Sequence, residues 1–204
     1  MLKSGAILAV LFLSVSFAAA QDYPLDVSVG AGPALSSSTS GNQTTQTVTK
    51  SYVGLATLRL NLSHKNSVDF NYGRIRNTQI YASSPYIYRI QDTLTEYTGD
   101  YVFRPFKWHG FRPFGLAGAG VLRFYPDYKG ITINQIYTAL PVVNQTRASF
   151  LYGAGFDYRV TKRWAVRVQY RGFLYKVPDF KVGNLFTGAT GNLSEPSVGV
   201  VFRF

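Results

Sequence analysis

Few residues of this chain have types and spacings that suit acid–base or nucleophilic catalysis. A serine nucleophile needs a base within hydrogen-bond reach, and the two histidines, His64 and His109, both lie in short predicted turns. Neither histidine has metal-ligand spacing with another histidine, and the chain has no cysteine. The carboxylates Glu96 and Asp100 share one strand face, where we expect an arginine to neutralise them. The sequence therefore predicts no enzyme, no metal site and no cofactor.

The ionic residues suit a different chemistry, which is ion pairing inside a closed structure. Five acids and seven arginines fall on the polar faces of alternating segments. We predict that they point into one lumen and form a network there: Asp26, Arg59, Asp69, Glu96, Asp100, Arg104, Arg123, Asp157, Arg159, Arg167, Arg171 and Arg203. Buried charges need partners, which favours a lumen plugged by this charged network. The excess of arginine leaves a narrow, weakly anion-preferring pore as the alternative.

Eight segments alternate between apolar and polar residues, as strands with one greasy and one polar face do. Most have about the length that a tilted membrane strand requires, and they lie near residues 25–35, 52–62, 67–76, 94–104, 112–124, 149–160, 163–174 and 197–204. The fifth is less clean, and we expect Phe114 and Phe124 on its lipid face and Arg123 on its inner face. The pattern predicts an all-β protein, an eight-stranded antiparallel up-and-down transmembrane β-barrel. Ten strands are the alternative count.

Two hairpins allow the strand register to be predicted from their turns. A symmetric turn pairs Arg59 with Asp69 in one hairpin, and another pairs Asp157 with Arg167. In both hairpins opposite charges then meet across the strands on the inner face. Cross-strand pairs of opposite charge stabilise a sheet and set its register.

The connections between these segments alternate in length. Three are short, around residues 64–66, 105–110 and 161–163, and four are long, roughly 36–51, 77–93, 125–148 and 175–194. Short periplasmic turns and long external loops are typical of outer-membrane barrels, and an even strand number puts both termini in the periplasm. The long loops carry tyrosines and basic residues, which suit recognition of an extracellular ligand whose identity the sequence leaves open: Tyr86, Tyr88, Arg89, Tyr128, Lys129 and Lys181.

The N-terminus predicts export. Lys3 precedes a short apolar run over 6–17 and the small residues 18–20, so we expect residues 1–20 to be a signal peptide and 21–204 to be the barrel domain. The formal net charge is +11. Because an exported chain meets little nucleic acid and its arginines are dispersed along strands, we expect no nucleic-acid partner.

The last predicted strand carries a resemblance to a known family. Its residues resemble the C-terminal sorting signal of bacterial outer-membrane barrels: Ser197, Gly199, Phe202, Arg203 and Phe204. Residues 152–171 resemble a strand–turn–strand of OmpA-type transmembrane domains. The resemblance implies a bacterial outer-membrane protein that contacts membrane lipid, is inserted by the barrel-assembly machinery and has a structural or adhesive role. We expect a monomer that presents long loops for adhesion or surface recognition, and whose closure brings Asp26 next to Arg203.

Overall fold

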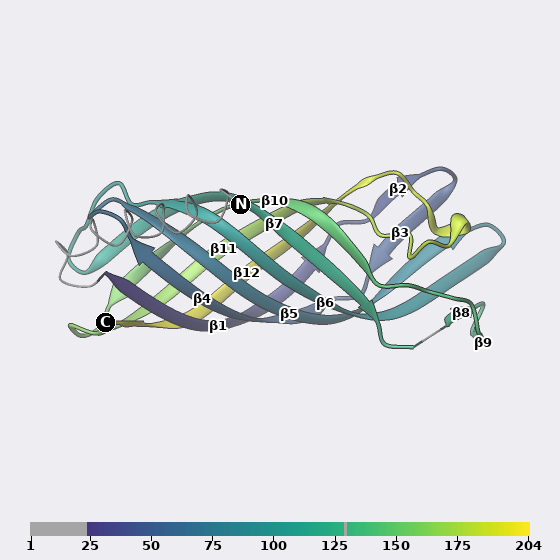
Figure 1. Cartoon of the computed structure of the whole chain (residues 1–204), viewed down its shortest axis with the longest axis horizontal. Coiled ribbons are helices and arrows are strands. Elements are labelled where there is room, and N and C mark those ends of the chain that lie inside the picture. Colours follow the sequence, from purple (N-terminus) through teal and green to yellow (C-terminus); the bar gives the residue numbers. More distant parts are fainter. Residues whose placement is uncertain (1–23, 129) are drawn as a thin grey trace, which may run out of the picture.

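The computed structural model describes residues 24–128 and 130–204, which form a closed antiparallel β-barrel (Figure 1). Within them, the wall consists of eight long strands: β1 (Leu25–Ser36), β4 (Ser51–Asn61), β5 (Asn66–Ser83), β6 (Tyr86–Phe103), β7 (Phe111–Pro126), β10 (Gln145–Arg159), β11 (Trp164–Lys176) and β12 (Thr190–Arg203). Shorter elements decorate one end: β2 (Thr39–Gly41), β3 (Thr44–Val48), β8 (Ile131–Ile133), β9 (Ile136–Thr138) and the 3-10 turn η1 (Gly183–Leu185). No helix in the described part of the chain is long and apolar enough to span a membrane. The predicted eight-stranded up-and-down barrel is confirmed.

The wall closes because each long strand pairs antiparallel with its chain neighbours in the wall and β12 pairs with β1. Short turns join the strands at one end, which we call the turn end (Figure 1). At the other, the loop end, β5 and β6 meet in a tight turn and longer segments join the other strands. The predicted register is confirmed in three pairs: Asp26 with Arg203, Arg59 with Asp69, and Asp157 with Arg167.

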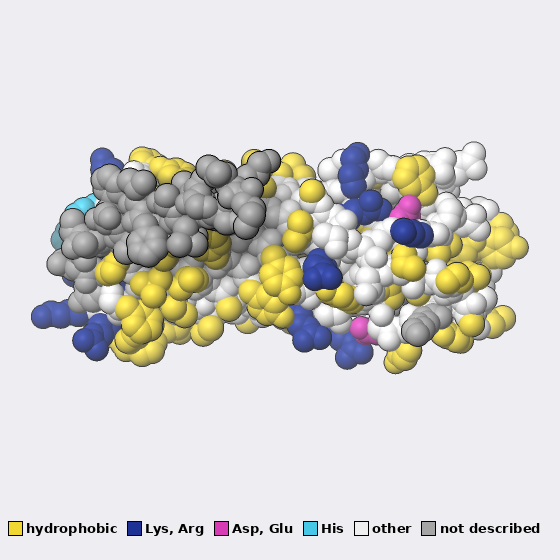
Figure 2. Space-filling view, in the orientation of Figure 1, with side chains coloured by type: hydrophobic (Ala, Val, Ile, Leu, Met, Phe, Trp, Pro, Cys, Tyr) yellow, Lys and Arg dark blue, Asp and Glu magenta, His cyan; other side chains and the backbone are white. Residues whose placement is uncertain are grey.

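Alternation along the strands separates an apolar outer face from a polar inner face. Val29, Phe70 and Val198 point outwards and are 62%, 51% and 57% exposed, whereas Arg59 and Asp69 are buried inside the barrel. Figure 2 shows hydrophobic side chains gathered over the part of the wall nearest the turn end, with basic side chains at its two borders. A lipid bilayer accepts this outer face, because apolar side chains facing hydrocarbon need no water.

The predicted orientation of β7 is wrong. Arg123 lies on the exposed outer face, where its guanidinium stacks 5.1 Å from the ring of Tyr125, while Phe114, Leu122 and Phe124 are buried inside. Pairing with β6 fixes this parity, since Leu122 lies opposite the inward Glu96. Small residues occupy the middle of β7 and do not distinguish its two faces in the sequence. Arg123 is tolerated outside because it lies near the border of the apolar surface, where a charge costs little.

The loop predicted over residues 77–93 is also wrong. β5 and β6 continue through it as one long hairpin that turns at Ser84 and Pro85. Here the inner face carries residues such as Gln79 and Tyr81 and the outer face is no longer apolar, so the contrast that marks a membrane strand disappears. Of the other three long connections, one contains the short strands β2 and β3, one contains β8 and β9, and the one between β11 and β12 contains η1.

Candidate functional site

The centre of the lumen holds two arginines and two aspartates from opposite sides of the wall. Arg59 on β4 donates from Nε and Nη2 to both carboxylate oxygens of Asp69 on β5, at 2.6 and 2.7 Å. Arg167 on β11 donates from Nε and Nη2 to both oxygens of Asp157 on β10, at 2.7 and 3.1 Å. Arg59 Nη1 reaches Asp157 across the lumen at 3.2 Å, and Arg167 Nη1 lies 3.8 Å from Asp69. We call these four residues the ionic quartet.

The ionic quartet is fully enclosed. Each of its four residues is at most 2% exposed. The ring of Phe114 lies 4.8 Å from Cζ of Arg59 and 5.4 Å from Cζ of Arg167, so both guanidiniums also make cation–π contacts. The four formal charges cancel, and the contacts join the β4–β5 hairpin to the β10–β11 hairpin across the lumen. A set of this kind becomes costly when one member is lost, because a buried charge is then left unpaired.

A second ionic cluster lies nearer the loop end. Arg171 on β11 donates to Glu96 on β6 at 2.9 Å and lies 3.5 Å from Glu195 on β12. Gly73 makes room for this cluster, since a Cβ at that position would lie 1.9 Å from a Glu96 carboxylate oxygen. Sequence reasoning missed Glu195 because it began the last strand after Pro196, a residue that gives no N–H to a strand ladder. The inward alternation of Leu193, Glu195 and Ser197 was the available signal.

Asp100 is held in a hydrogen-bonded row rather than paired with Glu96. It accepts a hydrogen bond from the side chain of Asn71, which also donates to Thr98 at 3.1 Å and accepts from Thr57 at 2.7 Å. The expected arginine is therefore present beside Glu96, as Arg171, whereas the prediction is wrong for Asp100, which forms no ion pair within 4 Å among the described residues.

Three further predicted arginines lie at the turn end. Arg104, Arg159 and Arg203 line a cavity of about 330 Å³ together with Asp26. Arg104 Nη2 donates to Ser67 Oγ at 2.6 Å and to a backbone carbonyl at 3.2 Å. Among the ion pairs of the described residues, none within 4 Å includes any of these three arginines.

Towards the loop end the lumen becomes apolar. A cluster of buried side chains fills it, including Ile75, Leu94, Leu122, Phe124, Leu151, Phe173 and Leu193. The segment between β11 and β12 folds onto this cluster with Phe180 and Leu185, which are fully buried. The Phe180 ring meets Phe124 edge to face at 6.4 Å between centroids, and Tyr81 Oη donates to the carbonyl of Pro178 at 2.6 Å. This segment is therefore anchored inside the mouth of the barrel.

Asp179 ties the same segment to β10. Its carboxylate accepts hydrogen bonds from Gln145 and, at 3.0 Å, from Arg147. Burial raises the pKa of the Asp179 carboxyl, but the hydrogen bonds from Gln145 and the Lys181 N–H and the charge of Arg147 outweigh it and hold the pKa below its ordinary value. The contact therefore stabilises the fold above that ordinary pKa and weakens as the pH falls through the lowered one.

A cleft opens at the loop end between the β5–β6 hairpin and the segment that contains β8 and β9. It has a volume of about 520 Å³, and its lining includes Arg89, Gln91, Tyr128 and Tyr137. β8 pairs with β6 beside it, with Thr132 opposite Arg89. Two of the predicted recognition residues, Arg89 and Tyr128, thus come together in one hollow.

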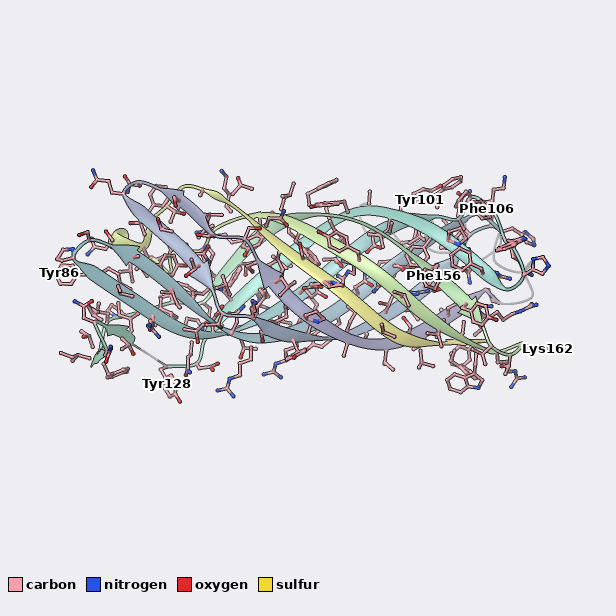
Figure 3. The ribbon with its side chains drawn as sticks, turned by 180° about the vertical axis from the view of Figure 1, so that it is seen from behind. Tyr86, Tyr101, Phe106, Tyr128, Phe156 and Lys162 are labelled. Atoms are coloured by element: carbon pink, nitrogen blue, oxygen red, sulfur yellow. The ribbon has the colours of Figure 1, made fainter. Side chains whose placement is uncertain are left out.

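The other predicted loop residues are dispersed. Tyr86 is 49% exposed at the tip of the β5–β6 hairpin, and both it and Tyr128 lie at the loop end (Figure 3). Lys181 is exposed on the β11–β12 segment. The prediction for Tyr88 is wrong: it is 4% exposed, because β6 continues here and turns this side chain inwards, where its hydroxyl accepts a hydrogen bond from Asn184 at 3.3 Å. Lys129 lies outside the described residues.

The described residues contain no group of three or more histidines, aspartates or glutamates that could hold a metal ion. His64 borders the turn-end cavity, and His109 lies in the turn between β6 and β7 with a φ of 44°.

Comparison with known proteins places this geometry in context. A family model for the outer membrane protein beta-barrel domain matches residues 5–204. Neisserial surface protein A is 15% identical, with 89% of this chain and 97% of that chain covered and a TM-score of 0.59. OprG from Pseudomonas aeruginosa is 14% identical, with 89% and 97% covered and a TM-score of 0.60. The N-terminal barrel domain of OprF from the same organism is 14% identical, with 90% and 100% covered and a TM-score of 0.52. No curated protein sequence matches significantly.

Proposed function

This chain belongs to the family of outer membrane protein beta-barrel domains, and on that premise we propose that it is a surface-recognition barrel. It lies in the bacterial outer membrane, with its apolar outer face in lipid. The cleft at the loop end binds an extracellular ligand, and the filled barrel is the scaffold that holds the cleft above the membrane. The observation that carries this proposal is the convergence of Arg89, Tyr128 and Tyr137 on one hollow.

The lining of the cleft favours a ligand that combines a ring with an acidic group. Tyr128 and Tyr137 are 59% and 60% exposed and offer flat apolar faces with polar tips. The guanidinium of Arg89 suits a carboxylate or a sulfate, which it can bind through two parallel hydrogen bonds. Acidic sugars have this combination of chemistry.

We expect Arg89→Ala and Tyr137→Ala each to weaken the binding of acidic glycans about tenfold, which corresponds to about 1.4 kcal/mol. The measurement is surface plasmon resonance of the protein in lipid nanodiscs against carboxylated, sulfated and neutral glycans. Lys50→Ala, which removes an exposed cation that lines neither the cleft nor the turn-end cavity, is the control and should bind as the unmodified protein does. Failure of every acidic glycan to bind, or unchanged binding by both cleft variants, would contradict the proposal.

We also propose that the lumen is plugged rather than conducting. An eight-stranded barrel is just wide enough for its side chains to fill it, and both the ionic quartet and the apolar cluster lie across the path of an ion. We therefore expect no discrete conductance steps from the folded protein in planar bilayers. Regular, anion-selective steps would contradict this and favour the narrow pore.

We further propose that the barrel-assembly machinery recognises residues at the end of β12 together with Phe204, which follows it: Ser197, Gly199, Phe202, Arg203 and Phe204. In support, the Phe202 ring packs against Trp164 and Phe204 at 4.8 and 4.7 Å between centroids at the turn end. We also propose that the barrel is a monomer and that it catalyses no reaction.

A further inference from the structure

The cavity at the turn end carries far more positive than negative charge. It has a volume of about 330 Å³ and faces the periplasm in the orientation that short turns define for such barrels. Its lining cations include Arg104, Lys107, Arg112, Arg159, Lys162 and Arg203. Asp26 is the one carboxylate among its described lining residues. We call this cavity the basic vestibule.

The nearest carboxylates deeper in the lumen, Asp69 and Asp157 of the ionic quartet, do not neutralise these cations, because arginines of the quartet already hold them. Arg112 is the register partner of Asp157, but Arg59 and Arg167 hold both oxygens of that carboxylate at 3.2 Å or less. The quartet is itself neutral, so it leaves no negative charge over for the vestibule. The positive excess at the turn end is therefore built into the fold.

Three guanidiniums of the vestibule also keep a buried donor without an acceptor in the described part of the chain: Nε of Arg104, Arg112 and Arg203. Arg104 and Arg203 are only 6% and 4% exposed. A buried donor of a charged group is costly unless it meets an acceptor. An anion in the vestibule would supply the negative charge that these guanidiniums lack.

The clustered charges act on a neighbouring side chain as well. The charge of Arg112 lowers the pKa of Lys107 below its ordinary value, with smaller contributions from burial and from Arg159 and Arg203. Lys107 lies in an exposed turn, so the positive field of the vestibule reaches its rim. A cleft with charge of one sign concentrates ions of the opposite sign.

We propose that the basic vestibule binds a compact anion that bears phosphate groups. Several converging guanidiniums favour an anion with more than one charge and several oxygens, because each guanidinium can bind two of them. The volume is more than ten times what one ordered water needs. The phosphate could be free in the periplasm or belong to a phospholipid headgroup at the rim of the barrel. This site lies at the opposite end from the recognition cleft and does not depend on it (Figure 3).

The test is calorimetric titration of the whole protein, in nanodiscs of zwitterionic phosphatidylcholine, with inorganic pyrophosphate at constant ionic strength. We expect saturable binding of one pyrophosphate per barrel. Arg112→Gln should raise the dissociation constant about tenfold, and Lys107→Gln should raise it about threefold. Arg76→Gln, which removes an exposed cation at the loop end, is the control and should leave the constant unchanged. Lys107 lies in an exposed turn, so its variant remains informative even if Arg112→Gln does not fold.

A parallel titration in nanodiscs that contain anionic phosphatidylglycerol distinguishes the two sources. Weaker pyrophosphate binding in these discs, with the loss abolished by Lys107→Gln, identifies the headgroup as the occupant. Unchanged binding identifies a free phosphate. The proposal is overturned if pyrophosphate fails to saturate the protein in phosphatidylcholine, or if the Lys107 variant and every folded Arg112 variant bind as tightly as the Arg76 control.

Discussion

Asp157→Ala is expected to lower the free energy of unfolding by about 3–5 kcal/mol, the range for breaking a buried ion pair from one side. In this variant Arg167 loses both of its hydrogen bonds to Asp157, and Arg59 loses its contact across the lumen. The two guanidiniums then remain buried with Asp69 as the one carboxylate of the quartet. Urea unfolding of the barrel in lipid vesicles, followed by tryptophan fluorescence, measures the loss.

The matched control is the exposed ion pair of Arg76 and Asp127. Its atoms are 2.9 Å apart, as close as those of the quartet, but the Arg76 side chain is 73% exposed. Asp127→Ala should therefore cost less than about 1 kcal/mol, since solvent screens such pairs. Equal losses in the Asp127 and Asp157 variants would show that enclosure does not determine the importance of the quartet.

Val198→Arg is expected to cost about 2–4 kcal/mol of unfolding free energy, the range for an arginine on the lipid face at the bilayer midplane. Val198 is 57% exposed on the outer face of β12. It pairs with Val168 of β11, and along β11 Val168 lies between the aromatic residues Trp164 and Tyr170. Urea unfolding in vesicles measures the effect, and heat-modifiable gel mobility checks that the variant still closes.

Asn192→Arg serves as the control on the same strand and the same face. Six residues separate the two positions, which is about 20 Å along the strand. Asn192 pairs with Leu174 of β11, two residues from Lys176, a charged residue that is already exposed on the outer face. We expect this variant to cost at most about 1 kcal/mol, because the penalty falls near the interface. A penalty that was the same at both positions would mean that Val198 does not face hydrocarbon.

Much of the fold could be predicted from the sequence because most wall strands alternate sharply. Where ionic residues occupy one face and large apolar residues the other, as with Arg59 and Asp69 against Leu60 and Val68, both orientation and register follow. The turn lengths then gave the strand order. This reasoning needed only local pattern and the requirement that charges avoid lipid.

The errors arise where that contrast fails. In β7 the small residues between Leu116 and Leu122 leave the two faces alike, and the buried side of the strand is decided by its pairing with β6. The β5–β6 hairpin continues beyond the apolar part of the wall, and its pairing turns Tyr88 inwards. The outer face there is not apolar, so the sequence does not show the alternation that marks a membrane strand. The cleft could not be predicted from the sequence either. Arg89 and Tyr137 come together because β8 pairs with β6 and β9 pairs with β8, and the sequence does not indicate these pairings.

The most direct test of the closed barrel is a disulfide across its seam. The chain has no cysteine, and Val29 on β1 lies opposite Val200 on β12. Opposite residues of antiparallel strands have Cα atoms about 4.5–5.5 Å apart, a separation that a disulfide can bridge. In V29C/V200C, mild oxidation of the membrane-embedded protein should remove both thiols, as counted by maleimide tagging after denaturation. V29C/V166C, in which the second cysteine is one strand further along at the same height, should keep both. Free thiols in V29C/V200C after oxidation would contradict a wall that closes between its first and last strands.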